Sequence, residues 1–227
     1  MFLLAIDTSG KQGSIALARS ETAAEDNRDF EVIEIAPLIG GTFSAQLIPQ
    51  IATLLATNGL TKENLGALAV ASGPGSFTGL RVGLAAVKAL AEVLNKPVAT
   101  VSLLELCVFV SGTQGKVMSA LDAGRGDVYV GEYTVPAGSG AGKEQLLTTK
   151  EFLLSAQGWT VVTPDSNLAA MASSSGLSVS TLSPISAGDV AHLGWLKLQR
   201  DQTVTPDQLE ANYIRRTDAE MLGRIGS

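Results

Sequence analysis

Apolar and polar residues alternate along the first hundred positions in two distinct rhythms. Short runs with a period near two indicate strands, and longer runs with apolar residues three and four apart indicate helices. In chain order the expected elements are strands at 2–7, 14–19 and 30–38, a helix at 44–58, a strand at 67–71 and a helix at 78–94. Three strands followed by helix, strand and helix predict a mixed sheet covered by helices.

The opening pattern returns near the middle of the chain. Ala5-Ile6-Asp7 ends an apolar strand before a glycine-containing hairpin, and Ala120-Leu121-Asp122 does the same. One short match is consistent either with chance or with two duplicated α/β halves. The later elements are expected as a strand at 98–101, a helix from Ser102, loops at 136–142 and 173–176, and a helix at 187–199.

The stretch SGPGSFTGLRVGLAAVKAL, residues 72–90, joins a strand to a helix through a glycine-rich turn. It is neither a Walker phosphate loop nor a dinucleotide fingerprint, because Gly73, Gly75 and Gly79 miss the required spacing. Ser76 or Thr78 is the expected N-cap, and free N–H groups at a helix start suit an anion. A tight structural turn is the favoured alternative.

The helix behind this turn has a very narrow polar stripe. Its charged side chains, Arg81, Lys88 and Glu92, fall within about 40° of one another on a helical wheel. Most of its circumference therefore requires burial, and Gly83 leaves room for another backbone. Two readings stay open: a surface that meets another protein, or a helix sandwiched inside its own domain. In the helix at 44–58, Pro49 is expected to bend the helix or delay its start.

The strand-end aspartates raise the question of a nucleotide site. Hairpins such as Asp7-Thr8-Ser9-Gly10 and the one after Asp122 expose consecutive N–H donors, which in two-lobed ATP-binding proteins grip phosphates and magnesium. Aspartate is also an ordinary turn residue.

Composition limits the remaining chemistry. The 227 residues suffice for one large domain or two small ones, and 45% of them are hydrophobic against 17% charged. With a single cysteine, Cys107, and a single histidine, His192, an internal disulfide and a zinc site of the usual ligands are excluded. Ser72 and Ser76 lack an evident base, Cys107 is expected in the core, and His192 is expected on a helix surface or packed.

Charge and hydropathy indicate the compartment and the partners. The formal net charge of −6 predicts weak unaided attraction to nucleic acid or anionic membranes. The start MFLLAID has no basic region and is too short for a signal peptide, and no apolar run approaches about 20 residues. We therefore expect a cytoplasmic protein.

Several segments together resemble the bacterial TsaB (YeaZ) family. They are LLAIDTSGKQGSIAL, SAQLIPQIATLL, ASGPGSFTGLRVGLAAVKALA, LDAGRGDVYVGEY and the tail YIRRTDAE, which span most of the chain. The resemblance implies the two-lobed α/β fold of actin, sugar kinases and Hsp70, with duplicated mixed-sheet halves. It implies an N-terminal lobe at 1–101 and a smaller C-terminal lobe at 102–227, whose last helix packs back on the first lobe.

The resemblance also implies a non-catalytic role in forming threonylcarbamoyladenosine in tRNA. The implied partners are TsaD, which carries metal, nucleotide and catalysis, and the ATPase TsaE, with a homodimer when TsaD is absent and tRNA bound only through the complex. The helix at 44–58 begins FSAQLIP, where the catalytic relative carries a histidine pair, so no metal site is expected and no cofactor is expected to bind tightly. The rival reading is a small-molecule kinase or ATP hydrolase of the same fold.

The resemblance assigns residues to two sites. The vestigial nucleotide-binding residues are Asp7, Thr8, Ser9 and Asp122. The expected partner interface consists of Ser44, Leu47, Ile48, Ile51, Leu55, Gly79, Arg81, Val82, Gly83, Ala86 and Val87. No catalytic residue is assigned.

Overall fold

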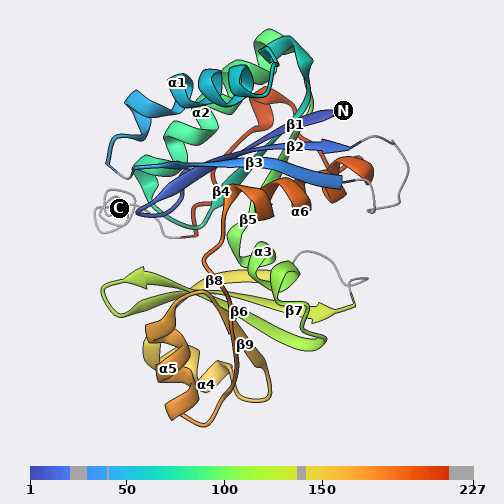
Figure 1. The fold of residues 1–227 in the computed structure, drawn as a ribbon. Coiled ribbons are helices and arrows are strands. Elements are labelled where there is room, and N and C mark those ends of the chain that lie inside the picture. The colour runs from blue at the N-terminus through green and yellow to red at the C-terminus, as the bar shows by residue number, and fades with distance from the viewer. Residues whose placement is uncertain (21–29, 40, 137–141, 215–227) are drawn as a thin grey trace, which may run out of the picture.

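The computed structural model describes residues 1–20, 30–39, 41–136 and 142–214, and these form two lobes that each contain a five-stranded sheet (Figure 1). The strands of the first sheet are β1 (Phe2–Asp7), β2 (Gly13–Ser20), β3 (Phe30–Leu38), β4 (Leu65–Gly73) and β5 (Val98–Ser102), in the order β3-β2-β1-β4-β5. The strands of the second are β6 (Gly115–Gly124), β7 (Asp127–Val135), β8 (Lys143–Thr148), β9 (Thr160–Thr163) and β10 (Ser178–Thr181), in the order β10-β9-β6-β7-β8.

The two sheets repeat one topology. Reversing the second order gives β8-β7-β6-β9-β10, in which each strand takes the place of the strand five earlier in the chain. In both sheets an antiparallel hairpin is extended by strands parallel to its first member. Asp7 and Asp122 occupy matching places near the ends of β1 and β6. The predicted α/β fold with duplicated mixed-sheet halves is confirmed.

The helices repeat as well. Within the lobes, α1 (Phe43–Thr57) corresponds to α4 (Thr149–Ser155), and α2 (Phe77–Leu94) corresponds to α5 (Ser166–Ser174). After each sheet comes one more helix, α3 (Leu103–Ser111) or α6 (Ala187–Gln199). Two short 3-10 turns, η2 (Lys62–Asn64) and η3 (Pro206–Gln208), complete the described elements.

The first sheet is covered on both faces. One face presents large side chains such as Leu4, Ile6 and Val70 to α1 and α2. The other presents alanines, among them Ala5, Ala16 and Ala69, to α6, which returns from the second lobe (Figure 1). Alternation along each strand separates the two sets, as the period of two requires. The small side chains let α6 approach closely, and a Cβ added at Gly194 would lie 2.6 Å from the Cβ of Ala69.

The second lobe has its own core. Helices α4 and α5 pack on one face of its sheet through residues such as Phe152 and Leu168, which meet Met118 and Val130. Helix α3 covers the other face, where Cys107 is fully buried as predicted, and burial raises the pKa of its thiol to about 12. No helix in the described part of the chain is long and apolar enough to cross a membrane.

Some boundaries differ from the prediction. Helix α1 starts at Phe43 and continues through Pro49, so Pro49 does not delay its start. Ser173 and Ser174 are the last residues of α5 and not a loop, and the turn follows them. The predicted loop at 136–142 lies largely outside the described residues.

We predict that Gly194→Ala lowers the stability of the fold, although alanine favours helix by about 1 kcal/mol. The added methyl group meets Ala69 on a buried strand, and overpacking of this kind costs about 1–3 kcal/mol. Urea unfolding followed by circular dichroism measures the difference. Gly188→Ala is the matched control in the same helix, because its Cβ would meet side chains alone, the Ile35 Cδ1 at 2.7 Å and the Ser186 hydroxyl oxygen at 3.3 Å, and the 46% exposed Ile35 has room to move aside. Equal stability of the two variants would contradict the prediction.

Candidate functional site

The turn after β1 packs directly against the start of α2. The Thr8 hydroxyl donates a hydrogen bond to the Gly79 carbonyl oxygen at 2.7 Å, and the Ser76 amide donates to the Ser9 carbonyl oxygen at 2.7 Å. Thr8 and Ser9 are only 2% and 6% exposed. A Cβ at Gly79 would lie 2.0 Å from the Thr8 carbonyl oxygen, so only glycine permits this approach. The first strand-end turn is therefore filled by the chain's own glycine-rich turn.

Asp7 is held by its own turn. Its Oδ1 accepts hydrogen bonds from the amide of Ser9 at 2.9 Å and from the Ser9 hydroxyl at 2.5 Å. Burial raises the pKa of the Asp7 carboxyl, the bonds from Ser9 oppose that rise, and the charge of Asp189 adds to it. Carboxyls perturbed in this way are frequent at functional sites, although structural networks perturb them too.

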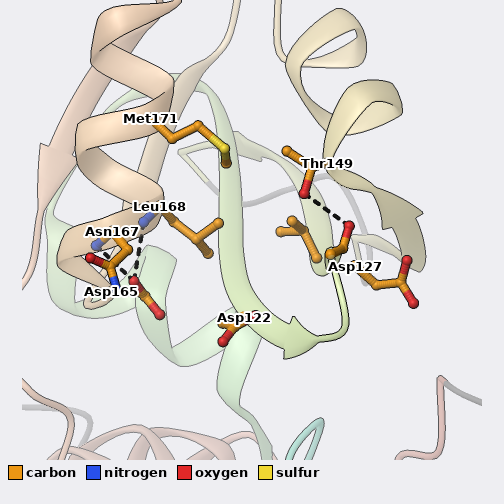
Figure 2. A pocket seen from close by; sticks show the side chains of 9 residues that line it. Asp122, Asp127, Thr149, Asp165, Asn167, Leu168 and Met171 are labelled. Carbon is orange, nitrogen blue, oxygen red and sulfur yellow. Dashed lines mark hydrogen bonds between the residues drawn. The ribbon is translucent and has the colours of Figure 1, made fainter.

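The matching place in the second lobe is open. A hollow of about 180 Å³ lies beside Asp122, with Val128, Leu168 and Met171 as its apolar wall (Figure 2). The Asp122 Oδ1 accepts a hydrogen bond from the Gly124 amide at 2.8 Å, and the Asp165 Oδ1 accepts from two amides at the start of α5. Gly126, Asp127, Thr149 and Asn167 complete the lining.

The repeats differ in the residues that face the hairpin at the start of the helix. Gly79 is the third residue after the N-cap Ser76 of α2, and Leu168 is the third after the N-cap Asp165 of α5. Glycine at this position lets the first hairpin close onto its helix, and in the second lobe the leucine side chain lines the hollow. The four predicted nucleotide residues therefore sit in unlike surroundings, with Asp7, Thr8 and Ser9 buried and Asp122 exposed.

The other chemical candidates are structural. The Ser72 hydroxyl donates to the Val101 carbonyl oxygen at 3.2 Å, and the Ser76 hydroxyl accepts from the Gly79 amide as the predicted N-cap. His192 stacks on Phe30 at 5.2 Å and meets the edge of Phe109 at 5.1 Å; burial lowers its pKa and Asp189 opposes that shift. Across the described ranges, no group of three or more His, Cys, Asp or Glu side chains is placed to hold a metal ion.

The predicted interface residues divide into two groups. Ser44, Ile48 and Arg81 are exposed and Val82 is half-buried. The remaining members are buried in the core of the first lobe: Leu47, Ile51, Leu55, Gly79, Gly83, Ala86 and Val87. The placement of these buried residues on an outer surface is wrong, because the apolar stripes of both helices face their own sheet.

Gly83 illustrates the correction. A Cβ there would lie 2.5 Å from the Thr8 hydroxyl oxygen and 3.5 Å from the Ile6 Cγ2. The space that a side chain at Gly83 would need is occupied by β1 and the turn after it. On the side that faces the sheet, α2 is therefore packed inside its own domain. The prediction that Gly83 marks a contact between two helix backbones is wrong.

The outward side of α1 and α2 forms a surface with little charge, which we call the helical face. The two helices lie side by side over the sheet (Figure 1). All exposed residues of α1 are uncharged: Ser44, Ala45, Ile48, Pro49, Ala52, Thr53, Ala56 and Thr57. Helix α2 adds Ala85, Ala89 and Val93, the last 74% exposed, beside its narrow charged stripe.

An aromatic cluster at the start of α2 was not predicted. The Arg81 guanidinium lies 3.7 Å from the centroid of the Phe77 ring, and its Nε donates to the Tyr213 hydroxyl at 3.1 Å. Phe77 and Tyr213 are 39% and 44% exposed, and their rings are 5.2 Å apart. Tyr213 is 132 residues from Arg81 in the chain, so no local pattern could have paired them.

Comparison with known proteins places the chain. A family model described as TsaD, tRNA N6-adenosine threonylcarbamoyltransferase, matches residues 38–215. The TsaB protein of Bacillus subtilis is 35% identical over 134 residues, which are 59% of this chain and 55% of that protein. The TsaB protein of Escherichia coli is 34% identical over 138 residues, again 59% and 55%. The chain belongs to this family, among its TsaB (YeaZ) members.

The solved structures agree in fold. YeaZ from Pseudomonas aeruginosa superposes with a TM-score of 0.68 at 24% identity, covering 94% of this chain and 100% of that one. Identity at this level shows the fold alone. In the sequence comparisons, the chain spans about half the length of the curated TsaB relatives that it matches.

We predict that Gly83→Leu in this TsaB-family chain prevents folding of the first lobe. The side chain would enter the space of Thr8 and Ile6, and a clash with a buried strand end cannot relax without moving β1. Circular dichroism should show a large loss of cooperative unfolding. Ala85→Leu, at an exposed position of the same helix, serves as the control and should unfold like the unaltered chain. Normal folding of Gly83→Leu together with loss of association would restore the interface reading.

We predict that Asp7→Asn stabilises the fold at pH 7. A carboxyl whose pKa is raised by folding binds its proton more tightly in the folded state, so stability falls as pH rises from the ordinary aspartate range through the folded-state pKa. The gain in the variant should therefore shrink as pH falls toward about 4. Urea unfolding at the two pH values measures it. Asp122→Asn, at an exposed carboxylate, should give no such gain, and destabilisation by Asp7→Asn at pH 7 would refute the prediction.

Proposed function

We propose that this chain is a non-catalytic scaffold or activator of TsaD in the transfer of a threonylcarbamoyl group to the adenosine next to the tRNA anticodon. The observation that carries the proposal is the helical face, an exposed two-helix surface whose α1 half has no charged residue. The relatives' name, tRNA threonylcarbamoyladenosine biosynthesis protein TsaB, supplies the pathway.

The helical face suits a protein partner. The centres of protein interfaces are depleted in charged residues, and contiguous exposed apolar area on a soluble protein marks a contact surface. Ile48 is 53% exposed and Val93 is 74% exposed, with alanines and threonines between and around them. At one end the cluster adds Arg81 and Tyr213, of residue types that often dominate binding energy at interfaces, and Phe77, an aromatic residue of a kind enriched there.

The filled strand-end turn supports the non-catalytic half of the proposal. A phosphate cradle needs amides that are free to point at a ligand. Here the turn after β1 is covered by the glycine-rich turn, and the Ser9 amide donates to Asp7. ATP, metal and catalysis would then belong to the partner subunits, with TsaE as the ATPase and tRNA bound through the complex. The same face would form a homodimer when TsaD is absent, in the cytoplasm.

The rival function, a small-molecule kinase or ATP hydrolase, draws on two features. Asp7 is a buried carboxyl with a raised pKa, and the second lobe has the open hollow beside Asp122. A kinase would need both turns open toward one another, so we place this function second.

The experiment combines purified chain, TsaD from the same organism, TsaE, tRNA, ATP and a threonylcarbamoyl donor. We expect no transfer by the chain alone and transfer when TsaD is added. Ile48→Glu places a charge in the middle of the helical face and should weaken the TsaD complex and the homodimer by about tenfold or more, because a charge without a partner at a buried contact is costly. Size-exclusion chromatography with light scattering measures association.

Leu154→Glu is the matched control. Leu154 is 67% exposed on α4 of the second lobe, far along the chain from the helical face. This variant should associate and support transfer as the unaltered chain does. Transfer by the chain without TsaD, or micromolar ATP binding that Asp7→Ala abolishes without unfolding, would favour the enzyme instead.

A further inference from the structure

The segment after α6 returns along the first lobe and ends at the start of α2. The Val204 amide donates to the Val98 carbonyl oxygen at 2.9 Å, which attaches the segment to the edge strand β5. Leu209 is buried in the core shared with α1 and α2. The Asn212 amide donates to the Ser72 carbonyl oxygen at 2.7 Å, at the end of β4. We call residues 204–213 the C-terminal strap.

A single carboxylate of the second lobe holds the far end of this strap. Glu144 lies on β8, and its Oε2 accepts a hydrogen bond from the Asn212 side-chain amide at 2.5 Å. Its Oε1 accepts from the Tyr133 hydroxyl at 2.7 Å and also from the Ser102 hydroxyl. Both carboxylate oxygens are thus engaged, and hydrogen bonds to a charged acceptor are the stronger kind.

Glu144 contacts the first lobe at the place where the chain passes from the first lobe to the second. Ser102 ends β5 and caps α3, where the chain passes from the first lobe to the second. Its register partner on the neighbouring strand is Gly73, next to the Ser72 that Asn212 holds. Glu144 is therefore connected to the ends of both strands. It accepts a hydrogen bond from Ser102 at the end of β5, and it reaches the end of β4 through Asn212, whose backbone amide donates to Ser72.

The strap also contacts the first turn of α2. Gly73 has a φ of +113°, and a Cβ there would lie 3.2 Å from the Asn212 carbonyl oxygen. The next residue, Tyr213, contacts the Phe77 ring and accepts the hydrogen bond from Arg81. A displacement of Asn212 would therefore act on the glycine-rich turn and on the cluster at the start of α2.

We infer that the C-terminal strap couples the orientation of the two lobes to the start of α2, with the Glu144–Asn212 hydrogen bond as the link. Rotation of the second lobe moves Glu144 away from Asn212 and loosens residues 72–82; closure tightens them. This coupling is a property of the isolated chain. It regulates the end of the helical face whichever partner that face binds, so it stands or falls separately from the proposed function.

An exchange of charge between the two residues tests the link. Asn212→Asp sets two carboxylates against each other and should release the strap, raising amide hydrogen exchange in peptides covering 72–84 by about tenfold. Adding Glu144→Gln restores a donor and acceptor in reverse, since the glutamine carbonyl still accepts from Ser102 and Tyr133 while its amide donates to the new aspartate. The double variant should return to within about twofold of the unaltered chain, because the bond lost is remade.

Gln145→Glu is the matched control. The Gln145 side-chain amide donates to the Glu132 carboxylate at 3.3 Å, so this variant creates the same repulsion wholly inside the second lobe. Exchange in 72–84 should not change. Failure of Asn212→Asp to raise exchange there, failure of the double variant to restore it, or an equal effect of Gln145→Glu would each overturn the inference.

A second measurement follows the distance between the two lobes. Cysteines placed at Ile48 and Leu154, both well exposed, carry spin labels, and the buried Cys107 thiol with its raised pKa stays unlabelled. The distribution of distances between the labels should broaden in Asn212→Asp and narrow again in the double variant. An unchanged distribution in Asn212→Asp would overturn the coupling, even if exchange in 72–84 rises.

Discussion

The close approach between the turn after β1 and the first turns of α2 sets the arrangement of the first lobe. Gly79 and Gly83 face Thr8, and any side chain at Gly79 would collide with the Thr8 backbone. Because the start of α2 can pack closely against the end of β1, the apolar side of the helix contacts the sheet. Leu80, Leu84 and Val87 are thereby buried in the core. With this side buried, the opposite side of α2 faces outward beside α1. The close approach at Gly79 and Gly83 therefore determines both the core and the helical face.

The duplicated lobe lacks glycine at the equivalent position. The second lobe has the same strand order and an equivalent helix, yet Leu168 occupies the position of Gly79. There the hairpin remains apart from the helix and leaves the hollow beside Asp122. Two halves with one topology thus differ at the turn after their first strand, one filled by its own glycine-rich turn and the other open but acidic.

The sequence predicted the elements of the first lobe well, because their periods are clear and the turns between them carry glycine. The Asp7 and Asp122 repeat left chance and duplication both open, and the family resemblance supplied the prediction of duplicated halves that the sheets confirm; Ser76 was rightly named among the expected caps. The second lobe was less predictable, since its helices are short and its edge strands have only four to six residues, lengths at which periodicity carries little information. Contacts such as Arg81 with Tyr213, or Glu144 with Asn212, join distant parts of the chain and have no local signal.

The error about Gly83 has a physical cause that bears on reading such helices in general. A glycine inside a helix shows that something comes close, but the sequence does not say whether it is a partner's backbone or the chain's own strand. Exposed small residues carry the complementary information. In α1 and α2 the buried glycines serve the fold, while uncharged positions such as Ala45, Ala52 and Ala89 remain exposed without any role in the core. Absence of charge at these exposed positions, and not the presence of glycine at buried ones, is therefore the feature on which the proposed partner surface rests.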